Sequence, residues 1–136
     1  MRIAQEKVES FHAKQGVTIN DIPTLVNSAT TKQRYEYILE ELNEYVKADY
    51  EADLVAVADA LGDLLYVVLG TAVVHGINIE PIFDEIHRSN MTKSALNAKG
   101  KGGKGPDYEP PRLGELLFQQ RHPELMHLRN TKGSIN

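Results

Sequence analysis

The stretch from Leu54 to Val68, LVAVADALGDLLYVV, places two carboxylates in the middle of an otherwise apolar helix pattern. Asp59 and Asp63 are one helical turn apart, so their side chains point the same way. Apart from Tyr66, the other side chains are apolar or small. Burial of one unpartnered carboxylate is costly, and burial of two side by side costs more. A fold that contains this helix must pair the aspartates with Lys or Arg, let them share a proton, or hold a cation.

Helix patterns account for most of the chain, and no clear alternating strand pattern or internal repeat is present. Gly16 and Gly76 each follow a helix pattern and mark its end, and Asn78 is placed to cap the next helix. The expected helices cover about residues 3–14, 31–50, 52–75, 79–91 and 112–120. We therefore predict an all-α fold, a four-helix-type bundle with a basic Gly/Lys/Pro loop after Lys93 and a short C-terminal helix.

The two longest expected helices differ in their patterns. The helix at about 52–75 is apolar almost all round, which indicates burial on most sides. The helix at about 31–50 carries an apolar stripe, and its glutamates fall on a face roughly opposite to that stripe. The stripe residues are Tyr35, Ile38, Leu39, Leu42, Tyr45 and Val46. Taken alone, the glutamate motif EELNE is most simply a solvated acidic face.

Length and composition limit the classes of protein. A chain of 136 residues predicts one domain, 1–136, with a core at about 8–117 and a frayed tail at 130–136. The absence of cysteine excludes disulfides and thiolate metal sites and fits a cytoplasmic protein. A net charge of −4, spread along the chain, argues against nucleic-acid binding. The uncharged run Leu64–Val74 is shorter than the ~20 residues that cross a bilayer, so no membrane span is expected.

A divalent cation is the most economical partner for the aspartates. No Lys or Arg occurs between Lys47 and Arg88, so a cationic side chain must come from elsewhere. Hard cations such as Mg²⁺, or Mn²⁺ as a substitute, take oxygen ligands that facing helices of a bundle can supply. We therefore expect the acidic face of the second helix to look across at the aspartates. The predicted metal ligands are Glu40, Glu41, Glu44, Asp59 and Asp63.

Candidate phosphate-binding residues follow the fourth helix. Asn90 and Lys93 are one turn apart at the helix end, and Lys104 lies in the basic loop. Mg²⁺ bound by carboxylates usually completes its shell with substrate phosphates, which these side chains are suited to hold. Lys99 and Lys101 lie among glycines and are more simply solvated. The loop has no P-loop spacing, and the histidines lack zinc-site spacing.

Three segments together are similar to a known family. ILEELNEYVKA, VADALGDLLYVVLGTAVVHGI and IFDEIHRSNMTK resemble the MazG-like, all-α nucleotide pyrophosphohydrolases, and in particular the phosphoribosyl-ATP pyrophosphohydrolase-like branch. The loop KGPDYEPP also resembles that family's C-terminal segment. The resemblance covers roughly Val8 to Leu117. It implies Mg²⁺-dependent hydrolysis of a nucleoside triphosphate to the monophosphate and pyrophosphate by a homodimer or homotetramer.

The family motif is Glu-Glu-x-x-Glu followed by Glu-x-x-Asp. The three glutamates match the first part and Asp63 matches the last residue, while Ala60 stands where the second motif has Glu. Asp59, one residue earlier, is expected to take over that role. Glu41 is the expected general base, and Tyr66, on the aspartate stripe, is a candidate substrate contact. Three other functions stay open. They are phosphoribosyl-ATP hydrolysis in histidine synthesis, a non-catalytic helical interaction module that holds a structural cation, and a nucleotide-binding regulator that has lost activity, to which Ala60 points.

Overall fold

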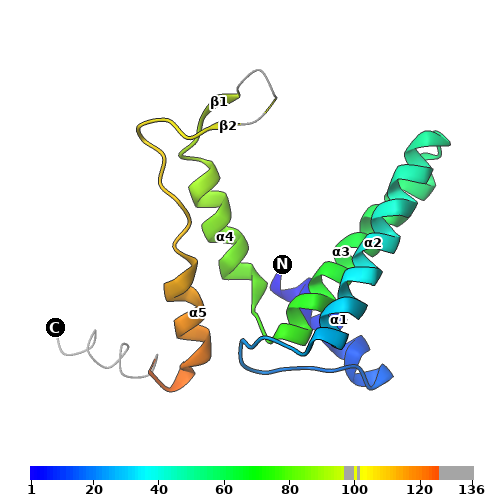
Figure 1. Ribbon diagram of the computed structural model, residues 1–136, viewed down its shortest axis with the longest axis horizontal. Helices are drawn as coiled ribbons and strands as arrows, with labels where there is room; N and C mark the ends of the chain where they lie inside the picture. The colour runs from blue at the N-terminus through cyan, green and yellow to red at the C-terminus, as the bar shows by residue number, and fades with distance from the viewer. Residues whose placement is uncertain (97–99, 101, 126–136) are drawn as a thin grey trace. The chain divides into compact units, whose positions relative to one another are not determined.

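The computed structural model describes residues 1–96, 100 and 102–125, and these residues are mostly helical (Figure 1). The predicted all-α fold is confirmed. The predicted helix ends are close to those observed. The elements are α1 (Arg2–Gln15), α2 (Ser28–Tyr50), α3 (Leu54–His75), α4 (Ile79–Asn90), β1 (Ser94–Leu96), β2 (Gly102–Gly103) and α5 (Leu113–Arg121).

The chain divides into two compact units, Met1–Ile77 and Asn78–Asn136. The first contains α1, α2 and α3, and the second contains α4, the two short strands and α5. The single domain expected over 1–136 stays a prediction. The tail at 130–136, which was expected to fray, lies outside the described residues, as do Lys99 and Lys101.

α2 and α3 form an antiparallel helical hairpin in the first unit, joined by the three-residue turn 51–53. Asp53 caps α3, since its Oδ1 accepts a hydrogen bond from the Ala56 N–H at 3.0 Å. Asn27 caps α2 in the same way through the Thr30 N–H at 2.8 Å. Each such cap stabilises a helix by about 1 kcal/mol. The short, capped turn fixes how the side chains of α2 and α3 face each other.

The core of the first unit lies around the C-terminal half of α3. Leu69, Val73 and Val74 are buried there together with Val8 of α1. The segment between α1 and α2 closes the end of α3, because Asn20 Nδ2 donates to the Val74 carbonyl at 2.7 Å. The larger buried side chains therefore sit at the end of the hairpin away from the turn that joins α2 to α3, while nearer the turn only the small side chains of Ala48 and Ala60 are buried.

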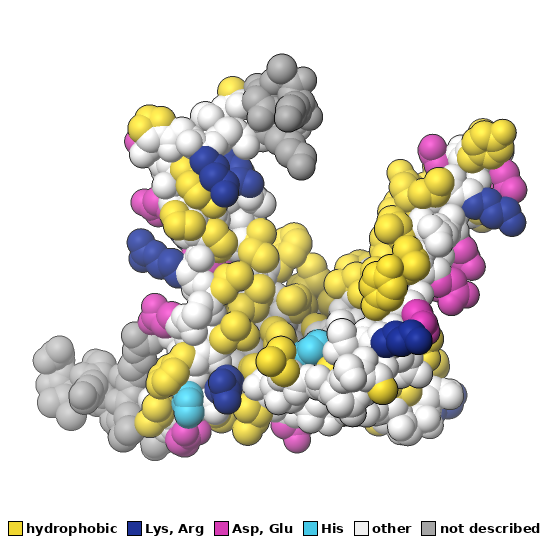
Figure 2. Space-filling view, viewed as in Figure 1, with side chains coloured by type: hydrophobic (Ala, Val, Ile, Leu, Met, Phe, Trp, Pro, Cys, Tyr) yellow, Lys and Arg dark blue, Asp and Glu magenta, His cyan; other side chains and the backbone are white. Residues whose placement is uncertain are grey.

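The N-terminal half of α3 is less buried in the single chain than the sequence predicts. Val55 is 82% exposed and Leu61 is 50% exposed. The expectation of a helix buried on most sides is therefore wrong for this half. The physical reason is that α1 and the following segment cover only the other end of α3, so α2 is the main neighbour here. Figure 2 shows hydrophobic side chains at the surface of the α2–α3 hairpin.

α2 also turns a different face to its neighbour than expected. The half-buried and buried positions on α2 are spaced by three and four residues, as in a helix–helix seam. They are Thr30, Arg34, Ile38, Glu41, Tyr45 and Ala48. Much of the predicted apolar stripe is exposed instead, with Tyr35 at 61% and Val46 at 58%. The predicted separation of apolar stripe and acidic face was wrong, because Glu41 lies on the same seam as Ile38 and Tyr45.

The second unit contains a small β-hairpin where the sequence predicts only a loop. β1 pairs with β2 in antiparallel fashion, with Ser94 opposite Gly103. Strands of two and three residues carry no alternating pattern, so the sequence gives no signal for them. α5 packs on α4, and Gln120 bonds both backbone groups of Asn78 at the start of α4.

Among the described residues, α3 alone has the length and hydropathy that a membrane-crossing helix needs. Core helices of soluble proteins pass the same test, so this is weak evidence for a span. α3 carries Asp59 and Asp63, and α2 packs along it. The absence of a membrane span stays a prediction.

Candidate metal centre on the α2–α3 hairpin

The antiparallel seam brings carboxylates of α2 and α3 together. Glu41 and Glu44 are three residues apart on α2, so they lie on one face, and Asp63 projects from α3 at the same level. One carboxylate oxygen from each of the three lies within 4.8 Å of the other two. We call these three residues the carboxylate cluster. The structure thus brings these three of the five predicted ligands together, and their role as metal ligands stays a prediction.

Glu41 is the least solvated member of the cluster. Its Oε2 atom is buried and has no hydrogen-bond partner among the described residues, whereas the side chains of Glu44 and Asp63 are exposed. A buried oxygen without a donor is costly, because nothing replaces the water it has lost. The position on the seam explains the burial, since Glu41 lies between Ile38 and Tyr45 on the side of α2 that meets α3.

The surroundings disfavour a negative charge on Glu41. Desolvation is the largest cause that raises the pKa of this carboxyl above its ordinary value, followed by the charges of Glu44, Asp63 and Glu40. The oxygens lie within 4.8 Å of one another, and at that separation two carboxylate charges repel each other by about 0.9 kcal/mol even in water. The cluster is thus an arrangement of like charges that a cation would stabilise.

The other two predicted ligands are placed differently. Glu40 is exposed on α2 and contributes charge to Glu41, but it is outside the trio. Asp59 is exposed on α3 and also outside it, so its expected replacement of the glutamate missing at Ala60 stays a prediction. The expected burial of both aspartates was wrong for the single chain, because the N-terminal half of α3 is covered mainly by α2.

A buried cation lies on the same seam, and sequence reasoning missed it. Arg34 Nε donates to Thr71 Oγ1 at 3.1 Å, and its Nη2 donates to the Val67 carbonyl at 3.0 Å. Burial lowers the pKa of this guanidinium. Arg34 precedes Glu41 by seven residues, or about 10 Å along α2. Arg34 therefore bonds α2 to α3 but does not neutralise the negative charge of the carboxylate cluster. The sequence feature that could have placed Arg34 on the seam is its seven-residue spacing from Glu41.

Arg34 also explains a glycine in the middle of α3. A Cβ at Gly70 would lie 2.6 Å from Arg34 Nη2 and 2.9 Å from Nε2 of the buried His12. Desolvation lowers the pKa of His12, and the charge of Arg34 lowers it further, against a hydrogen bond with the Thr18 carbonyl that raises it. These contacts join α1, α2 and α3 at the core end of the hairpin.

The predicted substrate contacts lie in both units. Tyr66 is on α3, and its ring meets that of Phe11 edge-on at 5.8 Å between centroids. Asn90, Lys93 and Lys104 belong to the second unit, at the end of α4 and beside β2. Their roles as substrate contacts stay predictions, as does that of Tyr66.

The cluster fits a hard divalent cation by the chemistry of its donors. It offers three carboxylate oxygens, one of which comes from a residue whose Oε2 lacks any donor. Mg²⁺ takes six oxygens and usually keeps waters or substrate phosphates among them. Glu41, Glu44 and Asp63 would hold such an ion and leave room for those other ligands. Nothing in this donor set selects Mg²⁺ over Mn²⁺.

The fold and the site together define the class: an all-α protein whose helical hairpin carries an acidic centre suited to a divalent metal. The family model for phosphoribosyl-ATP pyrophosphohydrolase matches residues 8–90, more than half of the chain. The chain therefore belongs to this family, within the MazG-like nucleotide pyrophosphohydrolases, and the resemblance in its sequence is confirmed. It is a family of phosphoanhydride hydrolases that typically use a divalent metal.

A curated relative is similar over a shorter stretch. "Uncharacterized protein L479" of Acanthamoeba polyphaga mimivirus is 46% identical over 54 residues, which are 40% of this chain and 22% of that protein. The chain thus spans about a fifth of the length of this relative.

Proposed function

We propose that the protein hydrolyses a nucleoside triphosphate to the monophosphate and pyrophosphate with the help of Mg²⁺. The observation that carries this proposal is the carboxylate cluster, with its buried and unpartnered Glu41 Oε2, in a member of a pyrophosphohydrolase family. A solvated acidic surface would leave that oxygen in water. An acidic centre that works with a cation explains both its burial and the like charges around it.

The residues of the cluster divide the chemistry between them. Glu44 and Asp63, the exposed members, would hold the cation together with one oxygen of Glu41, and the cation would polarise the phosphate and lower the pKa of a water. Glu41 takes the proton of the attacking water while the water oxygen forms its bond to phosphorus and pyrophosphate departs. The raised pKa of Glu41 suits it to hold that proton.

Substrate phosphates are held by cationic and amide side chains in this proposal. Asn90 and Lys93, at the end of α4, and Lys104, beside β2, supply them. Tyr66 contacts the substrate from α3. No ion pair joins either lysine to a carboxylate within the described residues, so both charges are available to an anion.

A homodimer or homotetramer is part of the proposal. Exposed apolar side chains on α2 and on the N-terminal half of α3 flank the cluster, and a second copy of the chain is the partner that would cover them. We also propose that the protein is cytoplasmic and that it has no nucleic-acid or membrane partner. Both proposals rest on the lack of cysteine and on the acidic, mixed charge.

Phosphoribosyl-ATP is the second candidate substrate, because the family model that matches carries its name. Hydrolysis of this compound in histidine synthesis uses the same bond chemistry with a different base and sugar environment. A non-catalytic module with a structural cation is the alternative from another class. The family match favours an enzyme over it, as do Lys93 and Lys104, which have no ion pair among the described residues.

Product analysis over a panel of substrates tests the proposal. The panel contains canonical and modified nucleoside triphosphates and phosphoribosyl-ATP, each with Mg²⁺ and with EDTA. We expect monophosphate and pyrophosphate from at least one triphosphate, only with the metal. Turnover of phosphoribosyl-ATP alone would select the second candidate, and no turnover of any compound would select the module. Glu36→Gln is the matched control for Glu41→Gln, because Glu36 lies on α2 outside the cluster and is exposed.

A further inference from the structure

Two contacts between α2 and α3 belong to the same antiparallel register. At the core end of the hairpin, Nη2 of Arg34 lies 2.6 Å from the place where a Cβ of Gly70 would stand. Nearer the turn, carboxylate oxygens of Glu41 and Asp63 lie within 4.8 Å of each other. Glu41 follows Arg34 by seven residues on α2, and its partner on α3 precedes Gly70 by the same number. The contacts are therefore about two turns, or about 10 Å, apart along each helix.

Neither apolar packing nor the acids select this register. α3 is apolar almost all round, so a shift of α2 by one turn would exchange one set of Leu, Val and Ala contacts for a similar set. Repetitive apolar seams of this kind need a buried polar residue to specify their register. Asp59 lies one turn before Asp63 and would stand opposite Glu41 after such a shift.

The turn that joins the two helices does not select the register either. Ala52, in the middle of this turn, has a φ of 54°, a left-handed conformation that is unfavourable for a residue with a Cβ. The turn is thus strained in the observed register. A contact elsewhere in the hairpin must hold the helices in place against this strain.

Arg34 is the buried polar residue of α2, and it makes that contact. Its Nε donates to Thr71 Oγ1 at 3.1 Å, and its Nη2 donates to the Val67 carbonyl at 3.0 Å. The guanidinium carbon lies 5.1 Å from the centroid of the Tyr37 ring, which supports the group from its own helix. Gly70 provides the space for the guanidinium on α3. A shift by one turn would put a bulky side chain of α3 in that space.

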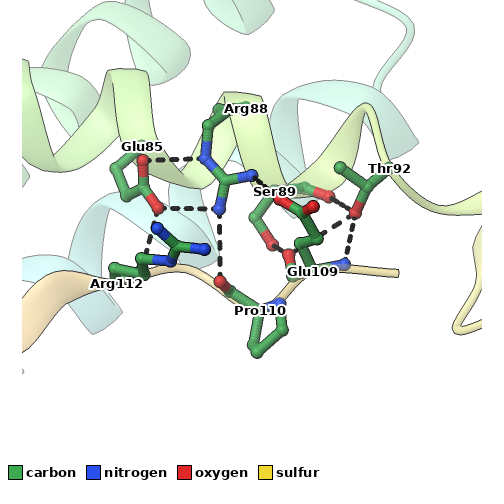
Figure 3. A network of polar contacts seen from close by, with 7 residues as sticks. All are labelled: Glu85, Arg88, Ser89, Thr92, Glu109, Pro110 and Arg112. Carbon is green, nitrogen blue, oxygen red and sulfur yellow. Dashed lines mark hydrogen bonds and ion pairs between the residues drawn. The ribbon is translucent and has the colours of Figure 1, made fainter. Parts of the chain in front are cut away.

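Arg88 of the second unit shows a different way to hold an arginine, which is by carboxylates (Figure 3). Arg88 donates two hydrogen bonds to Glu85 and one to Glu109 Oε2 at 2.8 Å. The hydrogen bond with Glu85 is the largest cause that raises the pKa of Arg88, whereas burial lowers the pKa of Arg34. No carboxylate pairs with Arg34 among the described residues. Arg34 therefore joins the helices without drawing an acid away from the carboxylate cluster.

We propose that Arg34 is a positioning residue for the carboxylate cluster, because its contact with α3 selects the register that brings Glu41 opposite Asp63. A shift of one turn moves one helix past the other by about 5.4 Å, which is more than the 4.8 Å that spans the cluster. In coiled coils, a buried polar residue specifies register in this way at a cost in stability. The positioning role deepens the proposed function and rests on it, since the cluster is where that function binds its cation.

The affinity of the full chain for Mn²⁺, measured by calorimetric titration without nucleotide, tests this role. Loss of a positive charge alone would strengthen cation binding in Arg34→Met, whereas loss of the register should weaken it by about tenfold to a hundredfold. Lys32→Met is the matched control, because Lys32 is an exposed lysine of the same helix, and it should not weaken binding. Unchanged or tighter binding in Arg34→Met would overturn the proposal, as would a wild type that does not bind Mn²⁺.

A role in stability alone predicts a different result. Thr71 Oγ1 also donates to the Val67 carbonyl at 2.8 Å, so Arg34→Met leaves neither group without a partner. Removal of a buried charge should therefore change the melting temperature of the metal-free protein little. A steep fall in melting temperature with an unchanged affinity for Mn²⁺ would assign Arg34 to stability and refute the positioning role.

Gly70→Ala provides a second variant in case Arg34→Met fails to fold. Its methyl group displaces the guanidinium of Arg34 without a change in charge, so the affinity for Mn²⁺ should again fall. Gly62→Ala is its control, because Gly62 is next to Asp63 in the sequence, yet a Cβ there meets no atom within 4 Å. Equal affinities in Gly70→Ala and Gly62→Ala would overturn the proposal.

A measurement without metal or substrate separates this proposal from the proposed function. In EDTA, a double-mutant cycle of Glu41→Gln and Asp63→Asn in thermal unfolding reports the repulsion between the two carboxylates. We expect this coupling in the wild type and its loss in the Arg34→Met background. Coupling that persists in Arg34→Met refutes the positioning role, whatever the protein hydrolyses. Coupling and Mn²⁺ affinity that both depend on Arg34, without turnover of any nucleotide, refute the proposed function alone.

Discussion

Glu41→Gln should have opposite effects on stability without and with metal. The substitution keeps the shape of the side chain and removes a charge that faces Glu44 and Asp63 within 4.8 Å. Each of these repulsions amounts to about 0.9 kcal/mol in water, or about 2 kcal/mol for both. Exposure of the two neighbours screens this sum, so we expect metal-free Glu41→Gln to be about 1 kcal/mol more stable than the wild type. For a chain of this size that is about 3–4 °C in Tm.

In the presence of Mg²⁺ the wild type should be more stable than Glu41→Gln. An ion bound only to the folded wild type stabilises it by about 2.7 kcal/mol at a hundred times its Kd, or roughly 9 °C. Glu41→Gln offers a weaker site and should gain much less. Thermal unfolding by circular dichroism, in EDTA and over a Mg²⁺ series, measures both effects, with Glu36→Gln as control. A wild type that is indifferent to Mg²⁺, or a destabilised Glu41→Gln in EDTA, would refute the like-charge cluster.

Three further outcomes follow from the same contacts. Gly70→Ala should destabilise the fold by about 1–3 kcal/mol in chemical denaturation, because the added methyl group meets Arg34 and His12. Gly62→Ala is the control, since a Cβ there meets open space, and it should be neutral or stabilising. Because burial lowers the pKa of His12 below 6.5, the wild type should lose stability as pH falls below about 6.5, and His12→Gln should flatten that loss in melts across pH. Asp63→Asn should keep the fold and lower kcat/KM by about a hundredfold or more, or about 2.7 kcal/mol, in a pyrophosphate-release assay.

The helices could be predicted because their ends carry local signals. Gly16 and Gly76 adopt the left-handed conformation where the sequence predicts a stop, and Asn78 caps α4 through Glu80 N–H. The sequence predicted less accurately which side chains are buried, because burial depends on which face of a helix meets a neighbouring helix. α2 has two candidate seams one residue apart, and helical periodicity does not tell which of them faces α3.

The candidate site was only partly predictable for the same reason. Glu41, Glu44 and Asp63 are recognisable as acids at helical spacing, and the structure brings them together. Asp59 has the same chemistry one turn earlier, yet it lies outside the trio. The pairing of Ser94 with Gly103 depends on a hairpin of very short strands, which has no signature in the sequence.

The rate of pyrophosphate release from a turned-over nucleotide tests the central claim most directly. The wild type, Glu41→Gln and Glu36→Gln are compared at saturating Mg²⁺ and in EDTA. We predict Mg²⁺-dependent release by the wild type and Glu36→Gln, and a rate lower by about a hundredfold or more in Glu41→Gln. Release by Glu41→Gln at the wild-type rate, or release that persists in EDTA, would contradict a metal-assisted hydrolysis centred on this glutamate.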